Sequence, residues 1–121
     1  MLALTRTAAN RVVNELGPGH RECVYARAIA CELRARALHV CIEHPVTVTY
    51  TASDGFSTAV GAERADIFLD SKAVIEVKLA ECITPAAVAQ ARRYARSLSV
   101  GVAIVVAISR DGGINLAEVT E

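Results

Sequence analysis

The 121-residue sequence contains no tryptophan, and aromatic residues make up only 4% of it. Because 53% of the residues are nevertheless hydrophobic, we expect a core built from alanine, valine, isoleucine and leucine. This apolar content excludes an intrinsically disordered chain, which would have too few such residues to form a core. The length is typical of one domain spanning residues 1–121.

The sequence also lacks an excess of charge of either sign, since thirteen basic residues balance thirteen acidic ones. This balance excludes a strongly cationic protein that coats nucleic acid. The charges are unevenly spread: residues 38–83 carry three basic and seven acidic groups, whereas residues 1–37 carry six arginines and three glutamates. An acidic centre beside basic flanks suits a metal site next to an anion-binding surface, although ordinary solvated faces give the same pattern.

Metal-binding and membrane signatures are absent as well. The cysteines show no C-x-x-C pair and no zinc-finger spacing; they are Cys23, Cys31, Cys41 and Cys82. We expect free, reduced and mostly buried thiols, and therefore an intracellular, cytoplasmic protein. The longest apolar run covers nine residues, 100–108. A membrane-spanning helix needs about 20, so no membrane partner is expected.

Hydrophobic periodicity predicts helices over residues 5–16 and 21–37, and strands over 39–51, 63–69 and 73–79. A tight turn at Asp70 and Ser71 joins the last two of these strands. Thr84 and Pro85 form a good helix start, as N-cap and first helical residue, for a third helix ending near residue 98. Strands over 100–108 and 114–119 follow. A β-hairpin followed by a β-α-β crossover predicts an α/β fold, with a mixed sheet flanked by helices.

Charged residues interrupt the apolar strand 73–79. Because side chains alternate along a strand, Glu76 and Lys78 share one face. Asp66 on the preceding strand lies next to Glu76 if the two strands form a hairpin. Adjacent carboxylates repel each other, and a hard cation such as Mg²⁺ relieves that repulsion. The alternative is an ordinary salt bridge between Glu76 and Lys78.

The predicted helices add two further polar residues. Glu22 falls in the middle of the apolar stripe of the second helix, which favours a carboxylate aimed into a site over the sheet. The alternative is a first-turn glutamate stabilised by the helix dipole. Gln90 lies at the edge of the apolar stripe of the third helix, one turn before Tyr94 and flanked by Arg93. Taken alone, Gln90 is typical of a surface amide and Tyr94 of a core aromatic.

These residues form a recognisable series. Residues 19–25 read Gly-x-x-Glu-x-x-Tyr, and Arg64-Ala65-Asp66 and Ile75-Glu76-Val77-Lys78 follow in order. Over residues 5–108 the chain resembles the GxxExxY family of the PD-(D/E)XK nuclease superfamily, and the spacing of Gln90 and Tyr94 is similar to an element of its exonuclease-like members. The resemblance implies a restriction-endonuclease-like αβββαβ core with an extra N-terminal helix.

The resemblance also implies an activity, a metal-dependent nuclease that hydrolyses phosphodiester bonds. The implied ligands of Mg²⁺ or Mn²⁺ are Asp66, Glu76 and the backbone carbonyl of Val77, with Glu22 holding a second ion or a metal-bound water. Lys78 would orient the attacking water and stabilise charge on the phosphate. Gln90 would position Lys78 or a phosphate group.

Nucleic acid is the implied partner, with DNA ranked before RNA. The residues implied to contact the nucleic-acid backbone lie on the second and third helices: Arg93, Arg27, Arg34 and Tyr94. Tyr94 would also brace the third helix. The basic surface is modest, so we expect a homodimer or another partner to extend it. Two alternatives stay open: a non-catalytic nucleic-acid-binding or assembly module that keeps the nuclease fold, and a purely structural oligomer.

Overall fold

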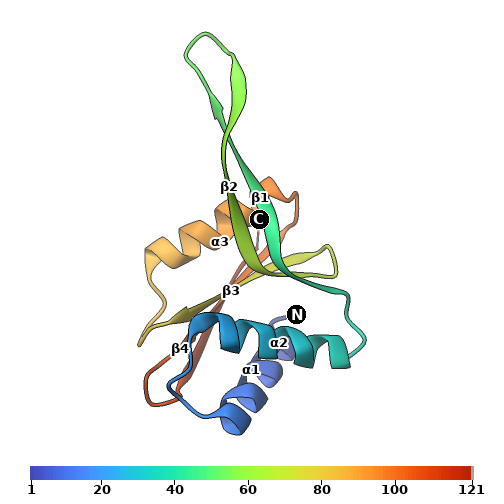
Figure 1. The fold of residues 1–121 in the computed structure, drawn as a ribbon, viewed down its shortest axis with the longest axis vertical. Helices are drawn as coiled ribbons and strands as arrows, with labels where there is room; N and C mark the ends of the chain where they lie inside the picture. The colour runs from blue at the N-terminus through green and yellow to red at the C-terminus, as the bar shows by residue number, and fades with distance from the viewer. Residues whose placement is uncertain (121) are drawn as a thin grey trace.

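The computed structural model describes residues 1–120, which form three helices and five strands (Figure 1). The helices are α1 (Leu2–Leu16), α2 (Glu22–Ala35) and α3 (Pro85–Ser97). The strands form one sheet in chain order: β1 (Val40–Thr51), β2 (Ser57–Leu69), β3 (Ala73–Leu79), β4 (Val102–Ile108) and β5 (Ile114–Thr120). β3 and β4 are parallel and all other neighbours are antiparallel, which confirms the predicted mixed sheet.

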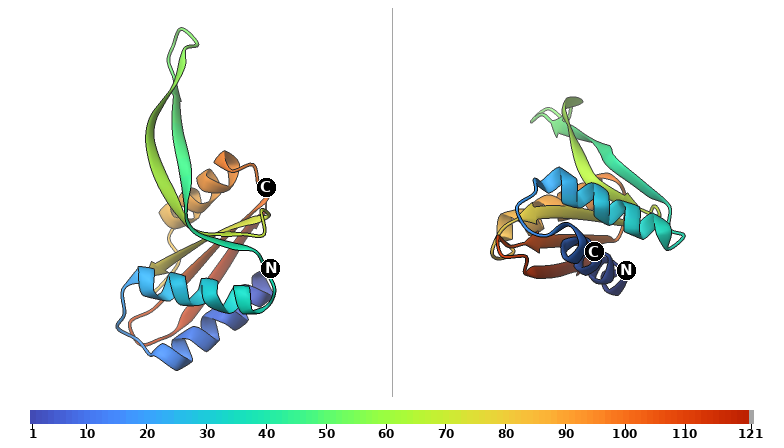
Figure 2. Two further views of the ribbon diagram at one scale, coloured as in Figure 1. Left: turned by 45° about the vertical axis from the view of Figure 1, so that its right-hand side comes forward. Right: turned by 60° about the horizontal axis from the view of Figure 1, so that its bottom comes forward.

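Helices cover both faces of the sheet (Figure 2). α1 and α2 pack against one face, where Tyr25 and Leu33 meet sheet residues such as Ile75. α3 packs against the other face, where Ala91 and Tyr94 meet a second set of sheet residues such as Val74. β3 is therefore buried on both faces over most of its length, because the crossover through α3 places it at the centre of the sheet.

Local sequence signals explain the element boundaries. The Thr84 hydroxyl accepts a hydrogen bond from the Ala87 N–H at 3.1 Å, and Pro85 is the first residue of α3, as predicted. Asp70 and Ser71 have φ angles of 54° and 53°, and they form the predicted tight turn between β2 and β3. A turn with two positive φ angles matches the right-handed twist of the strands that it joins.

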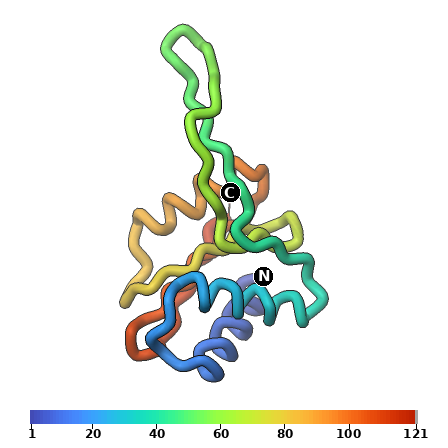
Figure 3. Tube along the Cα trace, viewed as in Figure 1, coloured from blue at the N-terminus to red at the C-terminus, as the bar shows by residue number. Residues whose placement is uncertain are grey.

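The largest departure from the predicted elements is in β2. It begins at Ser57, six residues before the predicted start at residue 63. Residues 57–62 are all exposed, so they lack the alternation of buried and exposed residues by which a strand is recognised. They pair with the end of β1 to form a two-stranded projection, residues 47–62, which we call the arm (Figure 3). α1 also begins three residues earlier than predicted, and β4 two residues later.

The four cysteines are free, but the expectation that they are mostly buried is wrong. Cys31 and Cys82 are exposed, and Cys23 and Cys41 are half-buried. The core is filled instead by the aliphatic side chains of the sheet and by two tyrosines, Tyr25 and Tyr94. Within residues 1–120, no helix has both the length and the apolarity needed to cross a membrane.

Candidate active site

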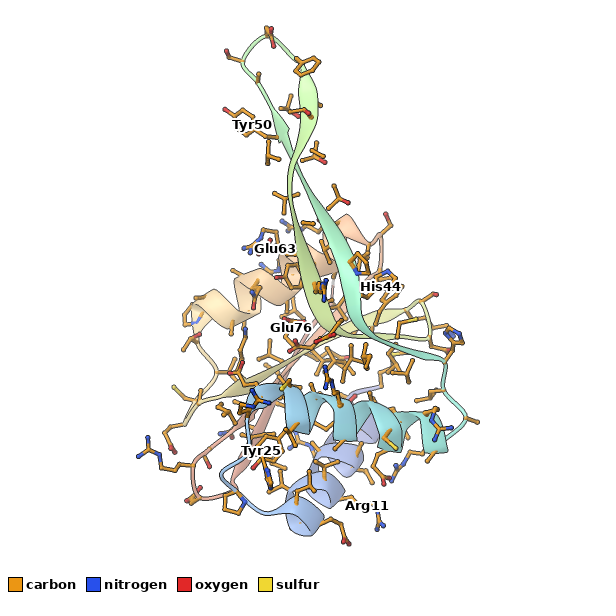
Figure 4. The ribbon with its side chains drawn as sticks, in the orientation of Figure 1. Arg11, Tyr25, His44, Tyr50, Glu63 and Glu76 are labelled. Atoms are coloured by element: carbon orange, nitrogen blue, oxygen red, sulfur yellow. The ribbon has the colours of Figure 1, made fainter. Side chains whose placement is uncertain are left out.

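The site forms where β2 and β3 separate. Their backbone pairing ends at Ile67 and Ile75, one position before Asp66 would face Glu76. Beyond this point, hydrogen bonds from backbone N–H groups to carboxylates replace the backbone-to-backbone hydrogen bonds between the two strands. The Asp66 N–H donates to Glu76 Oε2 at 2.7 Å, and the Val77 N–H donates to Asp66 Oδ2 at 2.8 Å. The two carboxylates thus meet at the fork between the strands, and Glu76 lies between α2 and α3 (Figure 4).

Burial disfavours negative charge at this fork. Glu76 is 2% exposed, and burial raises its pKa from 4.5 to about 8, with the nearby charge of Asp66 adding to the shift. Burial also raises the pKa of Asp66, while the hydrogen bond from Val77 and the charge of Lys78 oppose the rise. Two buried, adjacent carboxylates are unfavourable when both are ionised, and a bound divalent cation would stabilise them.

The donor atoms fit Mg²⁺ or Mn²⁺. Each carboxylate uses one oxygen to accept a backbone N–H. These two hydrogen bonds use Glu76 Oε2 and Asp66 Oδ2, so the other oxygen of each carboxylate is left for a cation. The Val77 carbonyl points to the same edge as its N–H, because both groups of a strand residue face one side. Mg²⁺ needs only one or two carboxylates, with water and phosphate completing its shell.

Residues 1–120 contain no larger cluster of metal-binding side chains. Over the described residues, no group of three or more His, Cys, Asp or Glu side chains gathers closely enough to hold a metal ion. This excludes a closed, tetrahedral zinc-type site in this part of the chain. The fork therefore fits an open site with few protein ligands.

Glu22 reaches the site from the first turn of α2. Its Oε2 accepts a hydrogen bond from the Leu79 N–H at 2.9 Å, on the open edge of β3 two residues beyond Val77. Its charge raises the pKa of both Asp66 and Glu76. The expected apolar burial is wrong, because Glu22 is exposed: the first turn of α2 extends past the packed part of the helix.

A pocket of about 510 Å³ lies between the end of β3, the loop that follows it and α3. Its polar lining includes Glu22, Lys78, Gln90 and Arg93, whereas Asp66 and Glu76 lie beside it and do not line it. Within residues 1–120, Lys78 has no carboxylate oxygen within 4.0 Å. The alternative of a Glu76–Lys78 salt bridge is therefore wrong, and the ammonium group is available to a ligand in the pocket.

Gln90 and Tyr94 form a hydrogen-bonded chain. Gln90 Nε2 donates to the Tyr94 hydroxyl at 3.2 Å, which donates to Glu63 Oε2 at 3.4 Å. Tyr94 is only 3% exposed, and its bond to Glu63 links α3 to β2, so the residue acts as a brace between these two elements. The Arg93 guanidinium lies 5.9 Å from the centroid of the Tyr94 ring, within the range of a cation–π contact.

The two arginines of α2 are not part of the pocket lining. Arg27 pairs with Glu43 at 3.4 Å, and Arg64 approaches the same carboxylate at 4.0 Å. Glu43 contributes to the raised pKa of Asp66, so this cluster lies near the fork. Arg34 is exposed further along α2. The structure thus brings Arg93 to the pocket and leaves Arg27 and Arg34 outside it.

Sequence reasoning missed two residues that shape the site. The Tyr25 hydroxyl donates to the Gly17 carbonyl at 2.7 Å and accepts from the His20 N–H at 3.2 Å, so it ties down the loop that leads to Glu22. Its signal was available, since Tyr25 ends the Gly-x-x-Glu-x-x-Tyr motif. Glu43 has a φ of 50° inside β1 and interrupts the pairing opposite Asp66, and no sequence pattern marks it.

Comparison with known proteins bears on the family and the fold of this chain. A family model described as the PD-(D/E)XK nuclease superfamily matches residues 1–115. No curated protein matches the sequence. A solved structure titled "Crystal structure of SSO0001" is similar over 99% of this chain, with a TM-score of 0.59 and 18% identity; the chain spans 66% of that structure's length. This likeness supports the restriction-endonuclease-like fold, and the family match shows that the chain belongs to the PD-(D/E)XK nuclease superfamily.

Proposed function

We propose that this chain is a single-domain, divalent-metal-dependent nuclease of the GxxExxY branch, which hydrolyses phosphodiester bonds in DNA. The observation that carries the proposal is the pair of carboxylates, Asp66 and Glu76, at the fork between β2 and β3. Lys78, free of any ion pair in the described residues, follows two positions later on the same face. A carboxylate pair beside an available ammonium group suits hydrolysis of a phosphodiester.

The residues divide the work as follows. Asp66 and Glu76, with the Val77 carbonyl, would hold Mg²⁺ or Mn²⁺, and Glu22 would hold a second ion or a metal-bound water. A bound divalent ion supplies a polarised phosphate oxygen and a water of lowered pKa. Lys78 orients the attacking water and stabilises negative charge that develops on the phosphate. Gln90, fixed by Tyr94, positions Lys78 or a phosphate oxygen.

Arg93 contacts the nucleic-acid backbone at the pocket, and Arg27 and Arg34 extend the contact along α2. A homodimer supplies further surface, because thirteen basic residues balanced by thirteen acidic ones give one chain a limited electrostatic attraction for DNA. The intracellular, cytoplasmic location predicted from unpaired cysteines belongs to the same proposal.

Incubation with single-stranded, double-stranded and branched DNA and RNA tests the activity, with Mg²⁺, Mn²⁺ or EDTA. We expect cleavage only with a divalent ion, and its loss in both Asp66→Ala and Lys78→Ala. Calorimetry should show that Asp66→Ala removes metal binding while Lys78→Ala keeps it. Lys72→Ala is the matched control, because Lys72 lies in the exposed β2–β3 turn. Metal binding by Asp66→Ala at the parent level, or cleavage by Lys78→Ala at the parent rate, would contradict the assignment.

A second candidate is a non-catalytic nucleic-acid-binding or assembly module with the same fold. The zero net charge favours this candidate, because tight binding to the phosphate backbone of nucleic acid depends on lysine and arginine in excess. Salt-dependent DNA binding without cleavage under any metal condition would select this candidate over the nuclease.

A further inference from the structure

The arm is the feature that the proposed nuclease site does not use. It projects away from the body of the molecule in every view (Figures 1 and 2). Its exposed large apolar side chains are Tyr50, Phe56 and Val60, which are 62%, 67% and 60% exposed. Because stabilisation scales with the apolar area removed from water, side chains left this exposed contribute little to the stability of one isolated chain. The arm therefore presents a surface suited to a partner.

Both long edges of the arm lack a neighbouring strand. β1 is the last strand of the sheet, so its outer edge is unpaired. β2 pairs with β3 only from Ile67 onward, which leaves its arm segment unpaired on that side. Proteins usually protect such edges with charged residues or proline. Here Pro45 lies before the arm, Asp54 lies in its terminal turn, and a single bulge interrupts the pairing after Val48.

The charge of the arm argues against a nucleic-acid ligand. Residues 47–62 contain no lysine or arginine and one acidic residue, Asp54. Binding to phosphate groups depends on cations, and the arginines near the site lie on α2, α3 and the base of β2 instead. A neutral strand rich in threonine, valine and tyrosine is typical of a surface that pairs with another strand.

We propose that the arm pairs with the arm of a second copy of this chain. The outer edge of β1, from Thr47 to Thr51, runs antiparallel to the same edge of the partner and extends the ribbon to four strands. An antiparallel pair of identical edges has two-fold symmetry, which closes the assembly as a dimer. Isolated two-stranded ribbons are marginally stable in water, and added strands stabilise them. Tyr50 and Phe56 become partly covered in the dimer.

Analytical ultracentrifugation over a wide range of protein concentration tests this proposal independently of nuclease activity. The parent should form a reversible dimer. Tyr50→Lys should raise the dissociation constant about tenfold or more, because it removes an interface aromatic and places like charges near the two-fold axis. Leu4→Lys is the control, since Leu4 is an exposed apolar residue on α1, outside the arm. A parent that stays monomeric throughout, or a Leu4→Lys variant weakened equally, would overturn the proposal.

A shortened arm gives a second test. Val48 pairs with Gly61, so residues 49–60 can be replaced by an Asn-Gly turn that closes the hairpin early. This variant should be monomeric while keeping the parent's circular dichroism and its thermal shift with Mg²⁺. If the variant with the shortened arm still dimerised, the interface would lie elsewhere and the proposal would be wrong. Unchanged self-association together with weaker DNA binding would make the arm a nucleic-acid contact and overturn the proposal.

Discussion

At the scale of single residues, Glu76 is the clearest example of a side chain that serves function at a cost to the stability of the fold. A carboxyl group at the centre of an apolar strand costs free energy in either protonation state, and an apolar side chain at this position would avoid that cost. Its carboxylate accepts one hydrogen bond, from the Asp66 N–H, and forms no ion pair within residues 1–120. A buried carboxyl group without a neutralising partner indicates a chemical use for the group.

The raised pKa of Glu76 predicts how stability depends on pH. The folded state keeps a proton up to a pKa of about 8, whereas the unfolded state releases it near 4.5. The metal-free protein should therefore lose stability as pH rises from about 4.5 to about 8, by roughly a few kcal/mol, since one pKa unit is about 1.4 kcal/mol. The raised pKa of Asp66 acts in the same direction.

Thermal melts in EDTA across this pH range measure the effect. Glu76→Gln removes the titrating group and should flatten the curve, whereas Glu81→Gln, on the exposed loop after β3, should leave it unchanged. Mg²⁺ should restore stability to the parent near pH 8 and not to Glu76→Gln. A Glu76→Gln curve as steep as the parent's would assign the pH dependence to another group.

At the scale of elements, the position of Glu22 depends on how the chain enters α2. The buried Tyr25 hydroxyl bridges the Gly17 carbonyl and the His20 N–H, which sets the path of the loop between α1 and α2. Glu22 then begins α2 and caps the Leu79 N–H on β3. The tyrosine of the motif thus positions the glutamate of the same motif through the loop.

Tyr25→Phe tests this link, because it keeps the ring and removes both hydrogen bonds. We expect a loss of about 1–3 kcal/mol of stability, since the Gly17 carbonyl and the His20 N–H lose a buried partner. The loosened Glu22 should also reduce the thermal shift caused by Mg²⁺. Tyr50→Phe, on the exposed arm, serves as the control and should match the parent. A Tyr25→Phe protein with the parent's melting temperature and metal response would show that the loop is held by other contacts.

At the scale of the whole molecule, the apolar core makes covalent crosslinks unnecessary. Two layers of aliphatic side chains enclose the sheet, and the four cysteines lie outside them. A chain of this length buries about two-thirds of its unfolded surface, which suffices for folding without disulfides.

The cysteines can be counted directly. Denatured, non-reduced protein should react with four equivalents of a thiol reagent, because all four are free. In the native protein Cys31 and Cys82 should react first, since they are exposed. Cys82 also lines the pocket, so a ligand there should slow its reaction relative to Cys31. Fewer than four thiols in the denatured protein would show a disulfide and contradict the expected reducing environment.

Much of the fold and the core of the site followed from periodicity. Strand alternation placed Glu76 and Lys78 on one face, and the turn at Asp70 and Ser71 brought Asp66 beside Glu76. These inferences held because they depend on local geometry along one hairpin. The exposure of Glu22 did not follow, because a helical wheel carries no information about where the neighbouring elements that cover a helix end. The extent of the arm did not follow either, because a strand exposed on both faces shows no alternation of polar and apolar residues.

By itself, the sequence determined the order of elements, the mixed sheet and the carboxylate pair, since local hydrogen bonding and side-chain periodicity dictate these. Only the tertiary structure decided that β2 pairs with β3 from Ile67 onward and leaves Asp66 unpaired, that Lys78 has no ion-pair partner within residues 1–120, and that Tyr94 is buried. Each of these depends on packing between segments distant in the chain. Before Ile67, β2 pairs with β1 alone, so hydrogen bonds from side chains replace the backbone pairing between β2 and β3. Where this separation occurs depends on the packing of the whole sheet.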